Sequence, residues 1–495
     1  LDFQHVLGLL SRQSCLSSSF FHSYTMSHTD LHIVVMAAGK GTRMKSAHSK
    51  VLQKLAGKPL LLHVLATAQA LQAQQAVVIT GHQAESVEAA TQKALQGSAL
   101  KLQFARQEEQ LGTGHAVQQA LPHLPDHGTA LILSGDVPLT QAATLQALLA
   151  ASAGDKLALL TINLPDPTGY GRIVRQGDGS GAVQAIVEQK DATPEQKQIQ
   201  EIYSGIMALP CAWLKKWLAR LDNNNAQKEY YLTDVVKFAV AEGKPVAAHV
   251  IGDEAEVAGV NSPQQLAALE RQYQSRQAEQ FMIAGVRLAD PARFDLRGSL
   301  TCGQDVEIDI NCVFSGKVSL GSNVKIGAGC VLADCTIADG VELKPYTVIE
   351  GEKLGASVGA GSILGPFARL RPGAQLAEEV HIGNFVEVKN STLAKGAKAN
   401  HLAYLGDATV GERVNYGAGS ITANYDGANK HRTVLGADVH IGSNCVLVAP
   451  VEIGAGSTVG GGSTISKDVP AQSLAVARGK QVLKEGWQRP QKNKV

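Results

Sequence analysis

Glycines and basic residues that could hold a phosphate follow the first apolar run of the chain. The stretch reads Met36-Ala37-Ala38-Gly39-Lys40-Gly41-Thr42-Arg43-Met44. Glycines let the backbone come close to a phosphate, and free N–H groups together with the Arg43 guanidinium favour its charge. The stretch is neither a Walker loop nor a full dinucleotide fingerprint, because Met44 stands where the third glycine belongs. A tight strand-to-helix turn would explain these glycines without any ligand.

Three further features favour a nucleotide over a plain turn. Lys50 lies a few residues on, within reach of the same phosphates. A second glycine turn, Gln110-Leu111-Gly112-Thr113-Gly114, follows another strand-like run. Ser134-Gly135-Asp136 ends an apolar run with a carboxylate, at the kind of edge where α/β sheets bind ligands and Mg²⁺. An Asp here could simply cap a helix, but the three features together indicate a nucleotide and metal site.

A second group of candidate catalytic and binding residues lies in the repeat half, with His401 as its candidate base. Acyl transfer to an amine needs a base, because an ammonium is not a nucleophile, and His titrates near neutrality. A lone His is more often structural, but here polar residues interrupt a small and aliphatic repeat. They should face solvent or a site, because inward polar groups would be buried without partners. These residues are Arg371, Lys389, Tyr404, Asn415, Asn424, Tyr425 and Lys430.

The first half of the chain alternates strand-like and helix-like segments, which predicts a parallel, doubly wound α/β sheet. Short apolar runs at 31–36, 76–80 and 130–134 predict strands, and 60–71 and 84–95 predict helices. After Tyr170 further strands, at 182–187 and 202–208, indicate a substrate-binding insertion. Residues 263–285 predict one helix, with Leu266, Leu269 and Tyr273 on a shared face.

The second half repeats every six residues. Ile441, Leu447, Ile453, Val459 and Ile465 follow one another without a slip, and shorter runs of the period begin at Leu320 and Ile382. This period is typical of a β-helix of short strands and tight turns, with one inward aliphatic residue per face. Two segments, 365–373 and 421–432, break the period and predict loops that leave the helix. Such a coil has a long groove between copies of itself, which suggests an oligomer.

Composition limits the remaining possibilities. The 495 residues allow two or three domains, and 45 Lys and Arg against 44 Asp and Glu give a net charge of +1. This balance gives no indication of nucleic acid or of a membrane surface as a partner, and no apolar run reaches the roughly 20 residues of a membrane span. The 7 cysteines form no CxxC pair, which favours a reduced, cytosolic chain. Residues 1–25 lack periodicity and precede Met26, so we expect an upstream extension; their apolar stretch is too short for a signal peptide.

These motifs together resemble a known enzyme family. The glycine loop, Lys50, and the stretches LGTGHA, GDVPL and DPTGYGRI resemble the sugar-nucleotide pyrophosphorylases. With the hexapeptide half, residues 26–489 resemble the bifunctional bacterial N-acetylglucosamine-1-phosphate uridyltransferase and glucosamine-1-phosphate N-acetyltransferase. The resemblance implies a Rossmann-like nucleotidyltransferase domain followed by a left-handed parallel β-helix. It implies acetyl transfer from acetyl-CoA to glucosamine-1-phosphate, then uridylyl transfer from UTP with release of pyrophosphate. By the same resemblance, the product would supply peptidoglycan and lipopolysaccharide precursors.

The resemblance also implies a role for each matching residue. Arg43, Lys50 and His401 would be catalytic, and Asp136 and Asn261 would hold Mg²⁺. The UTP and UDP-sugar site would comprise Met36, Ala37, Ala38, Gly39, Lys50, Gln107, Gly112, Thr113, Ser134, Gly135, Asp136, Gly171, Glu188, Tyr203 and Asn261. Glucosamine-1-phosphate would be bound by Arg371, Lys389, Tyr404 and Asn415. Acetyl-CoA would contact Ala418, Asn424, Tyr425, Ser443, Gly461 and Arg478.

The chain departs from the family pattern at four of its positions. Ser49 replaces a usual Pro, Ser134 a frequent aromatic, Tyr203 a frequent Asn, and Gly461 a frequent Ala. The expected domains are 26–254 for uridylyl transfer, 255–285 as a linker with a helix, 286–482 for acetyl transfer, and 483–495 as a basic tail. Two other readings remain: a nucleotidyltransferase whose β-helix only makes it a trimer, and a non-enzymatic scaffold.

Overall fold

The computed structural model describes residues 30–177 and 181–490, which form two compact units. The first unit runs to Leu52 and then from Leu60 to Asn261. The second unit holds Gln53–Pro59 and the chain from Ser262 onward. The predicted extension 1–25 and the end of the basic tail lie outside the described residues. In the described part of the chain, no helix has both the length and the apolar composition needed to cross a membrane.

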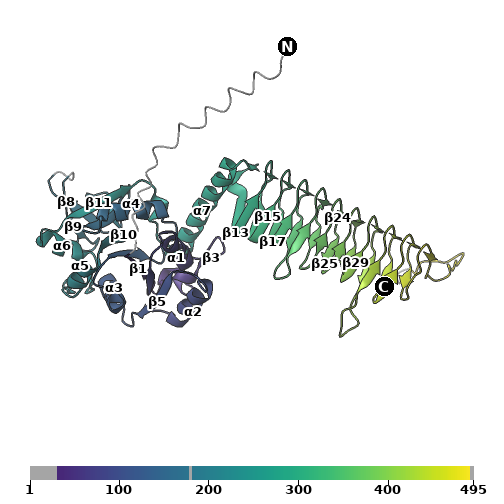
Figure 1. Ribbon diagram of the computed structural model, residues 1–495, viewed down its shortest axis with the longest axis horizontal. Coiled ribbons are helices and arrows are strands. Elements are labelled where there is room, and N and C mark those ends of the chain that lie inside the picture. The colour runs from purple at the N-terminus through teal and green to yellow at the C-terminus, as the bar shows by residue number, and fades with distance from the viewer. Residues whose placement is uncertain (1–29, 178–180, 491–495) are drawn as a thin grey trace, which may run out of the picture. The chain divides into compact units, whose positions relative to one another are not determined.

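The first unit is built on one sheet in the order β11-β7-β10-β6-β1-β4-β5, with β8 and β9 attached beside β10 (Figure 1). Its strands are β1 (Leu31–Met36), β4 (Gln75–Thr80), β5 (Lys101–Arg106), β6 (Thr129–Ser134), β7 (Leu157–Asn163), β8 (Arg172–Arg175), β9 (Val183–Val187), β10 (Glu201–Pro210) and β11 (Val246–Ile251). Its helices are α1 (Leu60–Ala70), α2 (Ala84–Ala94), α3 (Thr113–Ala120), α4 (Ala142–Ser152), α5 (Cys211–Leu218) and α6 (Asp234–Ala241). The predicted strands and helices are therefore confirmed to within about two residues.

Helices cover both faces of this sheet, as the doubly wound pattern predicted. Along β1 the side chains alternate, so that Val34 joins one core and Ile33 and Val35 join the other. The first core contains residues of α3, α5 and α6, and the second contains residues of α1, α2 and α4. The sheet is not wholly parallel, however. The prediction was wrong for β10, which runs antiparallel to β6, β7 and β8, because a hairpin-like insertion reverses the chain before it rejoins the sheet.

The second unit begins with α7 (Pro263–Ile283) and continues as a left-handed parallel β-helix of stacked coils (Figure 1). Ser262 caps α7 by accepting a hydrogen bond from the backbone N–H of Gln265 at 3.3 Å. At the other end of α7, Phe281 packs on Phe294, and Phe294 packs on Phe314, with ring centroids 5.8 and 5.6 Å apart. This aromatic stack covers the first coils, where a solenoid needs a cap.

One face of the β-helix is an 11-stranded parallel sheet of short strands. In sheet order these are β12 (Arg287–Leu288), β14 (Glu307–Ile308), β16 (Lys325–Ile326), β18 (Glu342–Leu343), β21 (Ile363–Leu364), β24 (His381–Asn384), β27 (Lys398–His401), β30 (Asn415–Tyr416), β33 (His440–Ile441), β36 (Thr458–Val459) and β38 (Leu474–Ala475). The other two faces form one 16-stranded sheet that is continuous through β13 (Phe294–Cys302), β15 (Cys312–Leu320) and β17 (Val331–Ile337).

The six-residue period marks the interior, as predicted. Ile441, Leu447, Ile453, Val459 and Ile465 are all at most 5% exposed and share one continuous core with the upstream coils. Cys312, Cys330 and Cys445 are buried in the same core. The inward aliphatic residues therefore hold the coils together by burial of apolar surface.

The expected loops were half right. Residues 365–373 do not leave the helix: β22 (Arg369–Leu370) lies within them, and Leu370 is buried six residues after Leu364 and six before Leu376. The Gly, Pro and Arg residues that hid this period occupy outward and corner positions, where the coil does not require an aliphatic side chain. Residues 424–432 do leave the coil after β31 (Ile421–Ala423), and an isolated bridge joins Tyr425 to Lys430.

Candidate active sites

A cavity of about 340 Å³ lies where β1, β5 and β6 end. Most of the residues predicted to bind the nucleotide line it. They are Met36, Ala37, Ala38, Gly39, Lys50, Gln107, Gly112, Thr113, Ser134 and Asp136. The carboxyl ends of parallel strands open at one edge of a sheet, so segments distant in the sequence meet there.

A cationic side chain sits between the two residues predicted to hold a metal. The Nζ of Lys50 lies 2.5 Å from Oδ2 of Asp136 and donates a hydrogen bond to Oδ1 of Asn261 at 2.9 Å. The side chains of Lys50 and Asp136 are only 12% and 17% exposed. Two oxygens that converge on one ammonium group also suit a divalent cation, whose remaining ligands water and phosphate can supply. Asp136 and Asn261 therefore supply oxygen ligands of a type that Mg²⁺ accepts, and among the described residues no group of three or more His, Cys, Asp or Glu side chains adds to them.

Two glycines, Gly112 in the cavity lining and Gly41 in the glycine loop beside it, are needed for their backbone conformation. Gly41 has φ +59°, and a Cβ there would lie 2.6 Å from Cβ of Lys50. Gly112 has φ +109°, and a Cβ there would lie 2.6 Å from the carbonyl oxygen of Tyr230. Both positions combine a left-handed conformation with a close approach, which only glycine tolerates. The turn that each glycine makes is what brings Lys50 and Thr113 to the cavity.

The cavity also includes residues to which the sequence assigned no role in binding. Gln110 donates a hydrogen bond from Nε2 to the carbonyl oxygen of Ala38 at 2.8 Å, so it ties the two glycine turns together. Glu229, Val51 and Ala116 also line the cavity. The position of Gln110 at the start of the second glycine turn was the one available signal. Arg43 is exposed on the short 3-10 helix Thr42–Met44, outside the lining of the cavity, and its catalytic role stays a prediction.

The residues predicted for the sugar form a separate group around β8, β9 and β10. A Cβ on Gly171 would lie 3.6 Å from the carboxylate of Glu188, and the carbonyl oxygen of Gly171 accepts a hydrogen bond from the N–H of Tyr203 at 2.9 Å. Burial raises the pKa of Glu188, although the Thr233 hydroxyl donates to it at 3.0 Å. Burial also raises the pKa of Tyr203 well above its ordinary value. The Tyr203 hydroxyl has no hydrogen-bond partner among the described residues.

His401 belongs to a row of residues that runs along the β-helix axis. Backbone hydrogen bonds from Gly419 to His401, from Asn444 to Ala418, and from Gly462 to Ser443 place successive coils in register. The row is therefore His401, Ala418, Ser443 and Gly461, and an Nη1 of Arg478 donates to the carbonyl oxygen of Gly461 at 2.9 Å. The predicted base thus ends a straight track of small residues, which leaves room for an extended ligand.

The residues predicted to bind the sugar phosphate form a cationic cluster on a different face. Arg371 and Lys389 are adjacent in the register of β22 and β25 (Glu387–Lys389), and Lys430 reaches Lys389 from the protruding loop. The neighbouring Lys430, together with burial and Arg371, lowers the pKa of Lys389. Glu387 accepts a hydrogen bond from Nη1 of Arg371 at 2.8 Å. Glu387 and Asp407 set two carboxylates against the three cations, so positive charge remains in excess, which suits a phosphate.

A buried carboxylate anchors the protruding loop beside this cluster. Asp407, 7% exposed, accepts hydrogen bonds from the amide groups of Asn390 and Asn424, the latter at 2.5 Å. Farther out, Asp426 pairs with His431 at 2.7 Å, and Tyr425 is exposed. The loop that carries Lys430 is therefore held at both ends.

Within one chain, the predicted acetyl-transfer residues lie on two faces. His401 ends β27 in the 11-stranded sheet, whereas Tyr404 begins β28 (Tyr404–Gly406) in the 16-stranded sheet. Leu402, with φ +48°, makes the corner between them. Asn415 is exposed on β30, in register with Lys398 and His440.

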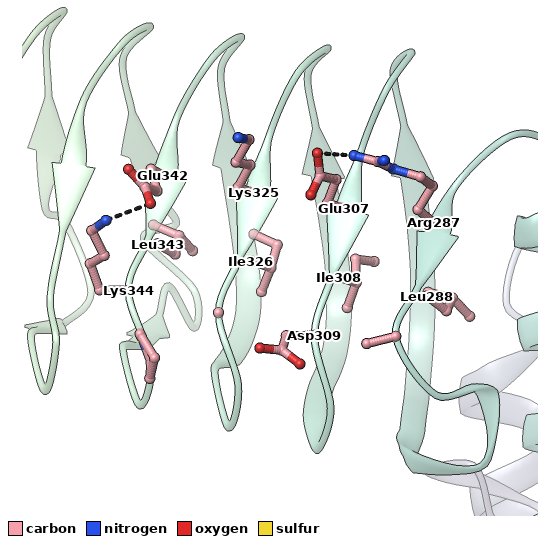
Figure 2. A pocket seen from close by; sticks show the side chains of 13 residues that line it. Arg287, Leu288, Glu307, Ile308, Asp309, Lys325, Ile326, Glu342, Leu343 and Lys344 are labelled. Atoms are coloured by element: carbon pink, nitrogen blue, oxygen red, sulfur yellow. Dashed lines mark hydrogen bonds and ion pairs between the residues drawn. The ribbon is translucent and has the colours of Figure 1, made fainter.

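A further cavity, of about 540 Å³, lies elsewhere in the described part of the chain (Figure 2). It follows the outer face of the first coils, where Arg287, Glu307, Lys325 and Glu342 form a row of alternating charge. Arg287 pairs with Glu307, and Lys344 pairs with Glu342. None of the predicted site residues line it, so its size does not indicate an active site.

Two family models match the chain in the two units. The MobA-like NTP transferase domain matches residues 33–228, and the bacterial transferase hexapeptide (six repeats) matches residues 300–334 and 432–467. The first match covers every residue that lines the 340 Å³ cavity except Glu229, and the second matches two separate parts of the β-helix.

Curated relatives match nearly the whole chain. The bifunctional protein GlmU of Polaromonas naphthalenivorans (strain CJ2) is 70% identical over 464 residues, which cover 93% of this chain and 98% of that protein. The GlmU of Acidovorax sp. (strain JS42) is 67% identical, with 94% and 99% covered, and that of Janthinobacterium sp. (strain Marseille) is 56% identical, with 94% and 100% covered. The chain belongs to the GlmU family of bifunctional proteins. As a GlmU-family enzyme it joins two activities of UDP-N-acetylglucosamine synthesis, uridylyl transfer and acetyl transfer to glucosamine-1-phosphate.

Proposed function

We propose that the cavity at the ends of β1, β5 and β6 binds UTP and carries out uridylyl transfer. A phosphate oxygen of N-acetylglucosamine-1-phosphate attacks the α-phosphorus of UTP in line, and pyrophosphate leaves. Such transfer depends on positioning and on neutralising charge rather than on a covalent intermediate. The backbone of Ala38 and Gly39 faces the phosphates, Lys50 neutralises their charge, and Gln107, Gly112 and Thr113 read the uracil.

Asp136 and Asn261 are the residues that would hold Mg²⁺, because their oxygens already converge on the Lys50 ammonium group. When bound, the metal ion would offset the negative charge of the triphosphate. Glu188 and Gly171 contact the N-acetyl sugar. Arg43, on the exposed turn beside the loop, attracts the triphosphate from outside the cavity.

We assign acetyl transfer to His401 and the residues around it. His401 takes the proton of the glucosamine-1-phosphate amine as that amine attacks the thioester carbonyl of acetyl-CoA, and the CoA thiolate leaves. Arg371, Lys389 and Lys430 bind the sugar phosphate, while Tyr404 and Asn415 hold the sugar. Acetyl-CoA lies along Ala418, Ser443 and Gly461 toward Arg478, flanked by Asn424 and Tyr425.

The observation that carries this proposal is that the two constellations lie in different compact units. We expect Asp136→Ala to abolish Mg²⁺-dependent formation of the UDP-sugar and to leave acetyl transfer nearly intact. We expect His401→Ala to reduce kcat of acetyl transfer on the order of 10²–10⁴-fold, the usual contribution of a general base, with uridylyl transfer unchanged. Comparable loss of both activities in either folded variant contradicts the assignment of two sites.

One assay of acetyl transfer distinguishes this proposal from a β-helix that serves only for assembly. Release of free CoA thiol from acetyl-CoA, in the presence of glucosamine-1-phosphate, is expected from the wild type. Its absence would leave the chain a nucleotidyltransferase with an inert repeat.

We further propose that the enzyme is a cytoplasmic homotrimer. One feature of the single chain supports this: His401 and the cationic cluster lie on different faces, so a complete site would need a face from a second copy. Sedimentation equilibrium is expected to give three times the mass of one chain, and a monomer with full acetyl-transfer activity would refute the trimer.

A further inference from the structure

One side chain fixes the ring of His401. Nδ1 of His401 lies 2.9 Å from Oδ1 of Asn384. An amide oxygen only accepts hydrogen bonds, so Nδ1 of the neutral imidazole carries the hydrogen and Nε2 carries the lone pair. Nε2 has no hydrogen-bond partner among the residues that the structure describes. The contact therefore selects the tautomer that a base needs.

The strands that carry Asn384 and His401 are longer than their neighbours, and their pairing keeps the two residues in register. β24 and β27 each have four residues, whereas every other described strand of the 11-stranded sheet has two. The added residues bring Asn384 directly opposite His401. A Cβ on the preceding Gly383 would lie 1.9 Å from the carbonyl oxygen of Asn400, so the two strands can approach this closely only with glycine there.

The corner that follows each residue is also constrained. Phe385 and Leu402, which come directly after Asn384 and His401, have φ +58° and +48°. The ring of Phe385 stacks on that of Phe367, with centroids 5.4 Å apart and an interplanar angle of 10°. A bulky residue takes a left-handed conformation only where its surroundings enforce it. The stacked ring of Phe385 thus holds the corner that follows Asn384.

We propose that Asn384 is a positioning residue for acetyl transfer. It holds the His401 ring by Nδ1–H so that Nε2 faces the substrate amine. This inference rests on the proposed role of His401 as the base. It predicts that Asn384 affects the reaction only through His401 and makes no contribution to substrate binding.

A double-mutant cycle tests this directly. Kinetics of acetyl transfer are measured for wild type, Asn384→Ala, His401→Ala and the double variant. We expect Asn384→Ala to lower kcat by about 10–100-fold, as for other residues that orient a functional histidine, with KM for both substrates within about twofold. In the His401→Ala background, the same change should alter the residual kcat by less than about twofold. A full further loss in that background, or a rise in KM alone, overturns the proposal.

A pair of substitutions of similar size separates orientation from packing. Asn384→Asp keeps an acceptor oxygen at the same place and is expected to restore most of kcat. Asn384→Leu fills the space without an acceptor and is expected to match Asn384→Ala. Equal activity of the Asp and Leu variants, each folded by circular dichroism and trimeric by sedimentation, overturns the proposal. If His401→Ala itself retains kcat, the assignment of the base fails; if only Asn384→Ala retains kcat, the base stands and this inference fails.

Discussion

At the scale of residues, Lys50 has a fixed position in the cavity at the ends of β1, β5 and β6. The Lys50 ammonium group is paired with Asp136 and bonded to Asn261, and both members of the ion pair are largely shielded from water. A triphosphate brings further negative charge, for which Lys50 and the cation proposed between Asp136 and Asn261 are the nearest complements. The contribution to catalysis that we propose for Lys50 therefore comes from a positive charge held at one fixed position.

Lys50→Met tests this proposed contribution of the Lys50 charge. The variant keeps the length of the side chain but removes the charge, and we expect kcat for uridylyl transfer to fall by about 10²–10³-fold, as when one preorganised donor is lost. It also leaves Asp136 without its ammonium partner, so the melting temperature of the first unit should fall. Acetyl-transfer kinetics serve as the control. Uridylyl transfer within a few-fold of wild type would show that Lys50 only fills the cavity.

A second prediction concerns His32, which lies in β1. Both of its ring nitrogens are buried without a hydrogen-bond partner among the described residues. Burial lowers the pKa of His32, the neighbouring His127 acts in the same direction, and Asp30 opposes them. The unfolded chain, with an ordinary pKa of about 6.5, then binds this proton more readily than the folded chain. Stability is therefore unaffected above that pH and falls as pH drops below it.

His32→Leu should remove this pH dependence. Urea unfolding of wild type and variant is followed between pH 7.5 and pH 5 by the fluorescence of Trp213 and Trp217, both in α5. The wild-type midpoint is expected to fall more steeply with pH than that of the variant. Parallel curves would mean that His32 protonates equally well in both states.

At the scale of elements, the β-helix is a stack in which each coil contacts only its neighbours. The inward residue Leu447, in β34 (Val446–Val448), is fully buried, whereas Glu452 on the next face is exposed. The stability of the acetyl-transfer half therefore depends on a few aliphatic side chains per coil.

Leu447→Ala measures one such side chain. We expect a loss of about 2–5 kcal/mol in unfolding free energy, from lost burial and the cavity left behind. Acetyl transfer should be inactivated at a lower temperature than in the wild type, while uridylyl transfer keeps its thermal profile. Glu452→Ala is the matched control and should change neither. Joint inactivation of both activities by Leu447→Ala would contradict independent unfolding of the two units.

At the scale of the whole molecule, the two compact units are not two consecutive stretches of the chain. The hairpin of β2 (Lys54–Leu55) and β3 (Lys58–Pro59) belongs to the second unit, although it follows Lys50 closely in the chain. The N–H of Ala56 donates to Glu270 of α7 at 2.6 Å, and Leu55 is fully buried. Glu270 in turn bonds the buried Gln274, which pairs with both backbone groups of Leu296.

A truncation that ignores this hairpin should therefore be defective. We expect a fragment of residues 26–261 to melt lower and to have a lower uridylyl-transfer rate than a fragment of residues 26–340, which keeps α7 and the first coils. Differential scanning calorimetry and kcat for UDP-sugar formation compare the two. Equal behaviour would mean that the hairpin folds without its partners in the second unit.

The sequence by itself determined the two architectures and most of the chemistry. The alternation of strands and helices and the six-residue period both depend on residues that are neighbours along the chain. The sequence therefore predicted β1, β4, β6 and the interior row at Ile441–Ile465. Glycine turns and edge carboxylates are equally local, which is why most of the predicted nucleotide residues line one cavity. The parts that involve long-range pairing could not be predicted in this way. The reversed β10, the regular coil at 365–373 and the hairpin at 53–59 were decided by tertiary structure. Tertiary structure also decided the pairing that brings Asn384 opposite His401. Strand direction, register and packing partners are set by contacts between distant segments, which the local sequence pattern does not relate.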